Sequence, residues 1–205
     1  VMFNKPVIVF EGIECSGKSL HIKNVCKFLK KKKIPYICLR EPGGSKNSEI
    51  IRKLILNRKS KFNRNTDLFL YSASRSENIQ KLKKFHKKKI ILIDRFTDST
   101  IAYQHFGFGV DLNLINKIHS VILNDFKIDF TFLNIVNNKN MLSRLKKRDK
   151  LNRYDKFSSK FYQKVQKGYL KIVRNKKNKY LIVDSNLELK RNKEIIIRKI
   201  NDLIK

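Results

Sequence analysis

The segment from Gly12 to Ser19 has the residue types and spacing of a phosphate-binding loop. It reads G-x-x-x-x-G-K-S and follows the apolar run Val7 to Phe10 at the expected start of a helix. Backbone N–H groups of such a loop surround a β-phosphate at the positive end of the helix dipole. We expect Lys18 to reach the β- and γ-phosphate oxygens of ATP and Ser19 to hold Mg²⁺. The residues expected to bind ATP here are Gly12, Ile13, Glu14, Cys15, Ser16, Gly17, Lys18 and Ser19.

A second apolar run, Ile90 to Ile93, leads directly into Asp94 and Arg95. An Asp at the end of a strand can simply cap the next helix or turn, but beside a phosphate loop a position near the metal ion is favoured. Arg95 carries a forked, permanently charged guanidinium that suits a phosphate. We therefore expect Asp94 near Mg²⁺ and Arg95 on a phosphate group.

Three further segments supply groups that a nucleobase and its phosphate require. Arg40-Glu41-Pro42-Gly43-Gly44 is a tight turn after an expected strand, and Tyr71 and Arg75 share one helix face at i, i+4. Residues 94–104 add hydroxyl, aromatic and amide groups. An aromatic face for stacking, together with arginine and amide donors, predicts a site for a second nucleotide.

The elements that must position these residues are those of a parallel α/β sheet. Short apolar runs alternate with longer segments of helical period, and neither a repeat nor a flexible linker divides residues 1–205. One domain is expected. The expected strands are Val7 to Phe10, Tyr36 to Leu39, Ile90 to Ile93, Phe130 to Ile135 and Tyr180 to Val183. The expected helices are Lys18 to Lys31, Asp67 to Phe85, Leu112 to Asn124, Lys139 to Arg148, Lys160 to Arg174 and Leu187 to Lys205.

The formal net charge of +31 creates a field that attracts polyanions. Lysines occur along the whole chain, so we interpret the charge as a solvated basic surface with weak, non-specific binding of nucleic acid. A non-enzymatic nucleic-acid-binding protein is the alternative from another class.

The three cysteines lack the spacing of a disulfide framework or a zinc site, which predicts free thiols in a reducing compartment. No apolar run approaches the ~18 residues of a membrane span, and the first residues lead straight into a strand rather than a signal peptide. A cytoplasmic protein without membrane attachment is expected.

Five groups of residues, spread over nearly the whole chain, carry a family pattern. They are Phe10 to Glu14 with the phosphate loop, Arg40 to Gly44, Tyr71 to Arg75, Asp94 to Gln104, and Phe161-Tyr162 with Val165 to Leu170. In these motifs the chain resembles thymidylate kinases of the bacterial type. The resemblance implies a P-loop NTP hydrolase fold of the nucleoside-monophosphate-kinase type, with a five-stranded parallel sheet flanked by helices and a lid at about residues 144–156. It also implies phosphorylation of dTMP to dTDP by ATP and Mg²⁺.

The resemblance further assigns roles on the acceptor side. Tyr71 would stack on thymine, where the family usually has Phe, and Tyr103 would crowd the 2′ position of the sugar. Glu14 would lie near the sugar hydroxyl and the metal ion, and Arg52, on a helix after the Pro-Gly-Gly turn, would join Arg95 on the acceptor phosphate. The residues expected to bind dTMP are Glu41, Arg52, Tyr71, Arg75, Arg95, Thr100, Tyr103 and Gln104, of which Arg75, Thr100 and Gln104 address the polar edge of the base.

The same resemblance places catalytic arginines in the lid. One subtype carries an Arg in the phosphate loop where this chain has Cys15, and the bacterial subtype carries its arginines later. Arg148 and Arg153 would close over ATP, and Arg144 would support them at the ATP site. The expected catalytic residues are Lys18, Glu14, Arg95, Arg148 and Arg153, and the expected metal ligands are Ser19, Asp94 and Glu14.

Two positions depart from the family pattern. Phe108 stands where an arginine is common in Y-Q-G-x-G-R-G, and Leu20 replaces a second hydroxyl after the phosphate-loop lysine. The expected activity is an ATP:dTMP phosphotransferase, and the nearest alternative is a kinase of the same fold that acts on another nucleotide or a deoxynucleoside. The resemblance favours a homodimer that associates through the helices near 67–85 and 112–124.

Overall fold

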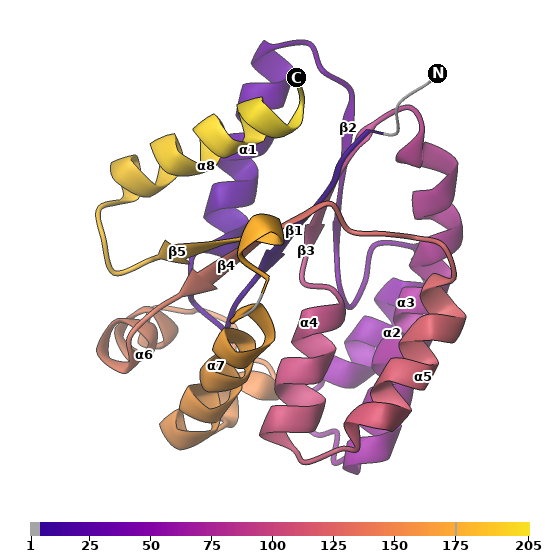
Figure 1. Ribbon diagram of the computed structural model, residues 1–205. Coiled ribbons are helices and arrows are strands. Elements are labelled where there is room, and N and C mark those ends of the chain that lie inside the picture. Colours follow the sequence, from indigo (N-terminus) through magenta and orange to yellow (C-terminus); the bar gives the residue numbers. More distant parts are fainter. Residues whose placement is uncertain (1–4, 175) are drawn as a thin grey trace.

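The computed structural model describes residues 5–174 and 176–205, and within them five strands form one parallel sheet. The strand order is β2-β3-β1-β4-β5, which places β1 at the centre (Figure 1). Each expected strand is confirmed to within one residue at either end. The strands are β1 (Val7–Glu11), β2 (Tyr36–Arg40), β3 (Ile90–Asp94), β4 (Phe130–Ile135) and β5 (Tyr180–Asp184).

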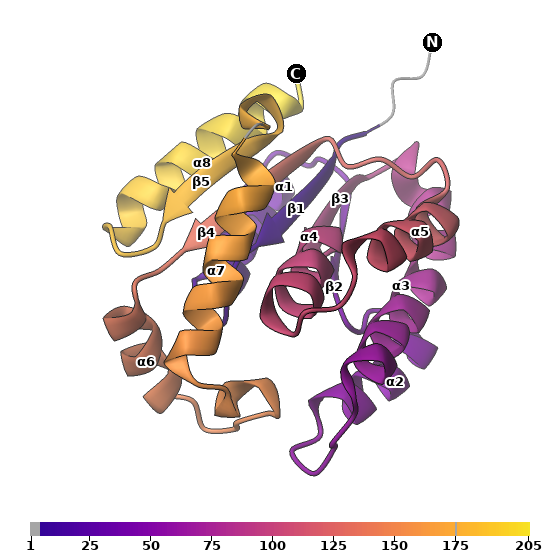
Figure 2. The same ribbon diagram turned by 60° about the horizontal axis from the view of Figure 1, so that its bottom comes forward.

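Helices cover both faces of this sheet, which explains why its central strands are apolar without alternation. Ile8 and Phe10 of β1 pack with side chains of α1 (Lys18–Lys31) and α8 (Leu189–Leu203). Val7 and Val9 face the opposite way and pack with Ile79 and other residues of α3 (Arg64–His86). Figures 1 and 2 show α1 and α8 on one side of the sheet and α3 on the other. A strand buried on both faces needs apolar residues at successive positions.

The remaining helices complete the covering layers. Their bounds are α2 (Lys46–Leu56), α4 (Thr97–Thr100), α5 (Leu112–Leu123), α6 (Asn138–Lys146) and α7 (Ser159–Val173). Of these, α2, α4 and α6 each carry polar side chains of the site. A π-helix, η1 (Ile101–Gly107), continues α4, and short 3₁₀ turns occur at η2 (Tyr154–Lys156) and η3 (Lys177–Lys179). Among the described helices, α4 and η1 were not expected from the sequence.

Local capping explains where two of these helices begin. Helix α3 starts three residues before the expected Asp67 because the Asn63 side chain accepts hydrogen bonds from the N–H groups of Asn65 and Thr66. Helix α2 follows Ser45, whose hydroxyl accepts from the N–H group of Ser48 at 3.2 Å. Since α2 carries Arg52, the expected helix after the Pro-Gly-Gly turn is confirmed.

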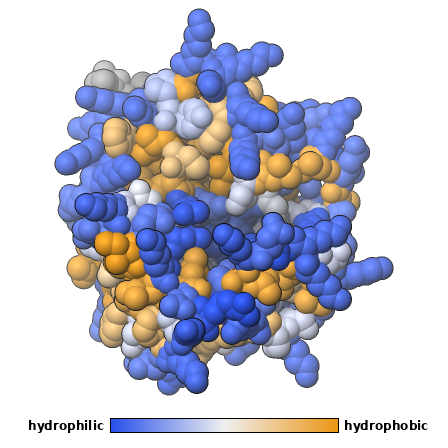
Figure 3. Space-filling view, turned by 180° about the vertical axis from the view of Figure 1, so that it is seen from behind, coloured by the Kyte–Doolittle hydropathy of each residue, from blue (hydrophilic) through white to orange (hydrophobic). Residues whose placement is uncertain are grey.

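The surface is hydrophilic with scattered apolar patches. Figure 3 shows this mixture on the face seen from behind, where hydrophilic side chains separate the apolar groups. In the described part of the chain, no helix combines the length and apolar character that a membrane crossing requires.

Candidate functional site

A cavity of about 420 Å³ opens at the carboxyl ends of the central strands, where parallel α/β sheets bind ligands. Its size lies within the range of small-molecule sites. Basic side chains outnumber acidic ones in its lining, so the cavity is suited to a polyanionic ligand. The basic residues are Lys18, Arg40, Arg52, Arg75, Arg95, Arg144 and Arg148, and the acidic ones are Glu14, Glu41 and Asp94.

The phosphate loop connects β1 to α1 through glycine conformations that other residues rarely adopt. Gly12 has a φ of 136°, and a Cβ atom there would lie 2.1 Å from the carbonyl oxygen of Asn134. The Nζ atom of Lys18 donates to the carbonyl oxygens of Gly12, at 3.0 Å, and Ile13, at 2.8 Å. Gly12 and Ile13 therefore hold Lys18 through their backbone, whereas residues 14–19 line the cavity.

Burial changes the acidity of Lys18. The side chain is 7% exposed, and the loss of solvent, followed by the nearby charge of Arg95, lowers the pKa of Lys18 to about 8. A bound triphosphate would oppose both effects by supplying negative charge. The ammonium group is thus placed where an anion is needed to stabilise it.

Ser19 and Asp94 meet at the metal position expected from the sequence. The Ser19 hydroxyl, in the first turn of α1, donates to Oδ2 of Asp94 at the end of β3, at 2.9 Å. Hydroxyl and carboxylate oxygens are ligands that Mg²⁺ accepts. Residues 5–174 and 176–205 contain no group of three or more His, Cys, Asp or Glu side chains that could enclose a metal ion. The pair thus fits an ion that takes its other ligands from phosphate and water, as Mg²⁺ commonly does.

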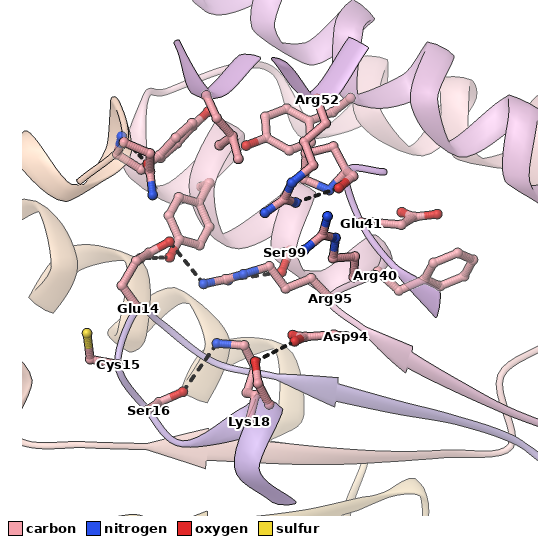
Figure 4. A pocket seen from close by; sticks show the side chains of 18 of the residues that line it. Glu14, Cys15, Ser16, Lys18, Arg40, Glu41, Arg52, Asp94, Arg95 and Ser99 are labelled. Atoms are coloured by element: carbon pink, nitrogen blue, oxygen red, sulfur yellow. Dashed lines mark hydrogen bonds and ion pairs between the residues drawn. The ribbon is translucent and has the colours of Figure 1, made fainter. Parts of the chain in front are cut away.

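Glu14 is not brought to this pair, contrary to the expectation that it helps to hold the metal. Its Oε1 atom is 2.9 Å from Nη2 of Arg95, and its Oε2 atom accepts a hydrogen bond from the Tyr103 hydroxyl. Figure 4 shows Glu14 and Asp94 on different sides of Lys18. Because Arg95 and Tyr103 occupy both carboxylate oxygens, Glu14 belongs with the expected acceptor residues.

Arg95 is held in a strained backbone conformation, with a φ of 67°. Its Nη1 atom donates to the carbonyl oxygen of Gly12 at 2.7 Å, and its guanidinium lies 5.3 Å from the ring centroid of Tyr103. Behind it, the buried Glu11 accepts from the N–H groups of Phe96 and Ser99, at 2.8 and 3.2 Å. Glu11 thereby fixes the loop that presents Arg95. The sequence did not predict this role, because the only signal was the position of Glu11 at the end of a strand.

Arg40 and Arg52 complete a group of three arginines with Arg95. Figure 4 shows all three directed into the same part of the cavity. Arg52 donates to the carbonyl oxygen of Pro42 at 2.6 Å, and burial lowers its pKa, so a phosphate in this space would be stabilising. Arg40 received no role from the sequence, although it directly precedes Glu41 at the end of β2.

The far end of the cavity contains the residues expected to recognise a base. Tyr71, Arg75, Thr100, Tyr103 and Gln104 all line it. Nε of Arg75 donates to Glu41 at 2.7 Å, and Nη1 donates to the Thr100 hydroxyl at 3.0 Å. Burial raises the pKa of Glu41, and Arg75 opposes this shift. The Gln104 Nε2 atom is buried without a hydrogen-bond partner among the described residues, so it is available to a ligand.

Two of the three lid arginines reach the cavity. Arg144 donates to the carbonyl oxygens of Cys15, at 3.0 Å, and Ser185, at 2.7 Å, and so lies against the phosphate loop. Arg148 is partly exposed, and its Nη1 atom lies 2.6 Å from Oδ1 of the buried Asp155. Both residues line the cavity from the end of α6 and the loop after it.

Arg153 does not line this cavity, and its expected closure over ATP stays a prediction. It donates through Nη2 to the buried Asp67, and its guanidinium lies 5.2 Å from the Tyr154 ring centroid and 5.6 Å from that of Phe62. A buried carboxylate requires a counter-charge, and Arg153 supplies it. This geometry makes Arg153 an anchor that joins the lid to α3.

Phe108 also lies outside the cavity lining and packs against the segment that joins the lid to α7. Its ring centroid is 4.8 Å from that of Phe161 and 5.4 Å from that of Phe157. The departure from the family's arginine therefore replaces a cation with an aromatic contact that joins the end of η1 to α7 and the segment before it. Leu20, the other departure, lines the cavity and is 44% exposed.

Comparison with known proteins identifies a family for this fold and cavity. The thymidylate kinase family model matches residues 10–196. A thymidylate kinase from Sulfurihydrogenibium sp. is 33% identical over 93% of this chain and 94% of its own length. One from Prosthecochloris aestuarii is 34% identical over 96% of this chain and 92% of its own length.

A solved structure supports the same relationship. The crystal structure of thymidylate kinase from Ehrlichia chaffeensis has a TM-score of 0.76 and 25% sequence identity, and the match covers 97% of this chain and 99% of the other. The family-model match spans the phosphate loop, strands β2 to β5 and the lid. The chain therefore belongs to the thymidylate kinase family.

Proposed function

We propose that this protein is a thymidylate kinase that transfers the γ-phosphoryl group of ATP to dTMP and releases dTDP and ADP. One observation carries the proposal: a single cavity has a phosphate-binding end and a nucleotide-acceptor end. The ATP end is formed by the phosphate loop with Ser19 and Asp94. The acceptor end is formed by the arginine group, Arg40, Arg52 and Arg95, and by the base-recognition residues beyond it.

At the ATP end, catalysis is mostly electrostatic. Lys18 would neutralise the β- and γ-phosphate oxygens, while Ser19 and Asp94 would hold Mg²⁺, which would supply further positive charge for the triphosphate. Arg148 lines the cavity and is partly exposed, which supports a contact with the transferred group. The acceptor phosphate is already ionised at neutral pH, so its attack requires positioning and no general base.

At the acceptor end, the chemistry of the lining favours thymine. Gln104 offers an unpartnered amide donor and Tyr71 offers a ring face. The bond from Tyr103 to Glu14 holds the Tyr103 side chain in place at the cavity, which supports the proposal that this ring crowds the 2′ position of the sugar. Arg52 and Arg95 together supply charge for the acceptor phosphate.

An acceptor panel tests this function. With ATP and Mg²⁺, turnover should be highest with dTMP and much lower with dCMP, AMP and thymidine, because dCMP and AMP lack the thymine edge and thymidine lacks the phosphate. Coupled measurement of ADP release checks the ranking. A preference for another acceptor would establish the alternative kinase. Strong DNA binding without ATP consumption would instead establish the non-enzymatic alternative.

We extend the proposal to a homodimer that associates through α3 and α5. These neighbouring helices carry Phe69, 55% exposed, and Val121, 81% exposed, on the surface of the chain. Large apolar side chains at such exposure are suited to a subunit contact. Light scattering of the purified protein should give about twice the 24.3 kDa chain mass, whereas the chain mass itself would contradict the dimer.

The compartment and the basic surface fit the same proposal. Cys15, Cys26 and Cys38 are all free, which agrees with a reducing cytoplasm. We assign the net charge of +31 to non-specific, salt-sensitive attraction of nucleic acid, because lysines are spread along the chain.

A further inference from the structure

The guanidinium of Arg75 is almost completely used by protein acceptors. The residue is 1% exposed, yet it lines the acceptor end of the cavity. Besides the bonds to Glu41 and Thr100, Nη2 donates to the carbonyl oxygen of Phe96 at 2.9 Å. A fourth contact is with His119, whose Nε2 atom lies 2.9 Å from Nη1 of Arg75. These four contacts use four of the five N–H donors of arginine. One N–H on Nη2 therefore remains for a ligand.

His119 contacts Arg75 from outside the cavity lining. It lies on α5, one turn after the buried Ile115, and so belongs to the face of the helix that packs against α3. The residue is 6% exposed and is not part of the cavity lining. His119 thus cannot touch a bound nucleotide, and any effect it has must pass through Arg75.

The chemistry of the contact fixes the tautomer of His119. Arg75 has only donors, so Nε2 of His119 must accept and the ring proton must lie on Nδ1. Burial, followed by the charge of Arg75, lowers the pKa of His119 to about 3. The imidazole is consequently neutral in the folded protein, and its lone pair is always available to Arg75.

We infer that His119 is a positioning residue for base selection: it accepts from Nη1 and thereby directs the one remaining N–H of Arg75 at the acceptor base. This inference rests on the proposed function. A single N–H in a fixed direction suits the carbonyl oxygen of thymine and opposes the amino group that cytosine carries at the same position. Without His119, Nη1 has a free donor in a buried place, and the guanidinium gains the freedom to reorient.

The experiment compares substitutions that differ in acceptor capacity. Gln carries an amide oxygen near the position of Nε2, whereas Leu and Met fill similar space without a strong acceptor. The His119→Leu variant should lose about tenfold or more in kcat/KM for dTMP, with a smaller ratio of dTMP to dCMP turnover and a KM for ATP within about twofold of wild type. His119→Gln should retain most of the dTMP preference. His86 is the last residue of α3, and His86→Leu is the control for loss of a histidine.

The outcomes separate the inference from the proposed function. Wild-type protein without dTMP kinase activity would overturn the function itself. If the wild type is active and His119→Gln loses its preference for dTMP, the acceptor role is wrong, whatever the other variants do. An unchanged preference in a folded His119→Leu or His119→Met protein would also overturn it. A loss in the Leu or Met variant that Gln restores, at similar thermal midpoints, supports the role.

Discussion

Replacing Lys18 by Ala should remove nearly all phosphoryl transfer and leave the fold intact. The ammonium group is the cation held inside the phosphate loop, and positioned charge supplies most of the catalysis in this class of reaction. The stability of the protein should not fall, because burial already disfavours the charged form and lowers the pKa of Lys18 to about 8. Single-turnover assays and a thermal melt measure the two effects.

A matched control for this substitution lies in the same helix. Lys23 is an exposed lysine of α1, so Lys23→Ala removes the same charge and side chain without touching the loop. Its activity should remain close to that of wild type. Retention of turnover by Lys18→Ala, with Lys23→Ala also active, would contradict the assignment of the phosphate loop as the ATP site.

Arg148→Ala should lower kcat by about 10³-fold or more, the effect of losing an arginine that stabilises charge on a transferred phosphoryl group. Its partly exposed side chain lines the cavity, and the buried Asp155 keeps the backbone and side-chain amide donors of Asn152, so the thermal midpoint should fall less than for Arg153→Ala. Arg153→Ala should behave differently, because it leaves the buried Asp67 without its counter-charge, a change that costs about 3–5 kcal/mol. Steady-state kinetics and chemical denaturation measure the contrast.

A double substitution distinguishes the anchoring role of Arg153 from a catalytic one. Removal of Asp67 as well, in Asp67→Leu with Arg153→Leu, eliminates both buried charges and should recover much of the lost stability. If Arg153→Ala instead lowers kcat as much as Arg148→Ala at unchanged stability, Arg153 reaches the reacting phosphate in a conformation other than the one described here.

The strands and the phosphate loop were predictable because their signals are local. A run such as Val7 to Phe10 is apolar at every position, and the loop motif follows it without a gap. The π-helix η1 was not predictable in this way. Its turns are wider than those of an α-helix, so the 3.6-residue period that reveals α-helices is lost between Ile101 and Gly107.

The partners of the charged site residues could not be predicted from spacing. Glu14 is paired with Arg95 and Arg153 with Asp67, and each pair joins segments more than 80 residues apart. The sequence indicates that these side chains are charged and near the site, but only the packing of α3, the lid and the β3 loop decides which charges meet. The contacts that Glu14 and Arg153 make in the structure, which the sequence did not predict, both depend on such long-range pairs.

The carbonyl oxygen of Gly12 is shared by two cations, and this sharing couples the binding of the two substrates. It accepts from Lys18, which we assign to ATP, and from Arg95, which we assign to dTMP. A ligand that draws either cation away from this oxygen changes the electrostatic surroundings of the other cation. The free energies of binding the two substrates are then coupled, and reciprocity requires that dTMP change the affinity for ATP by the same factor by which ATP changes the affinity for dTMP.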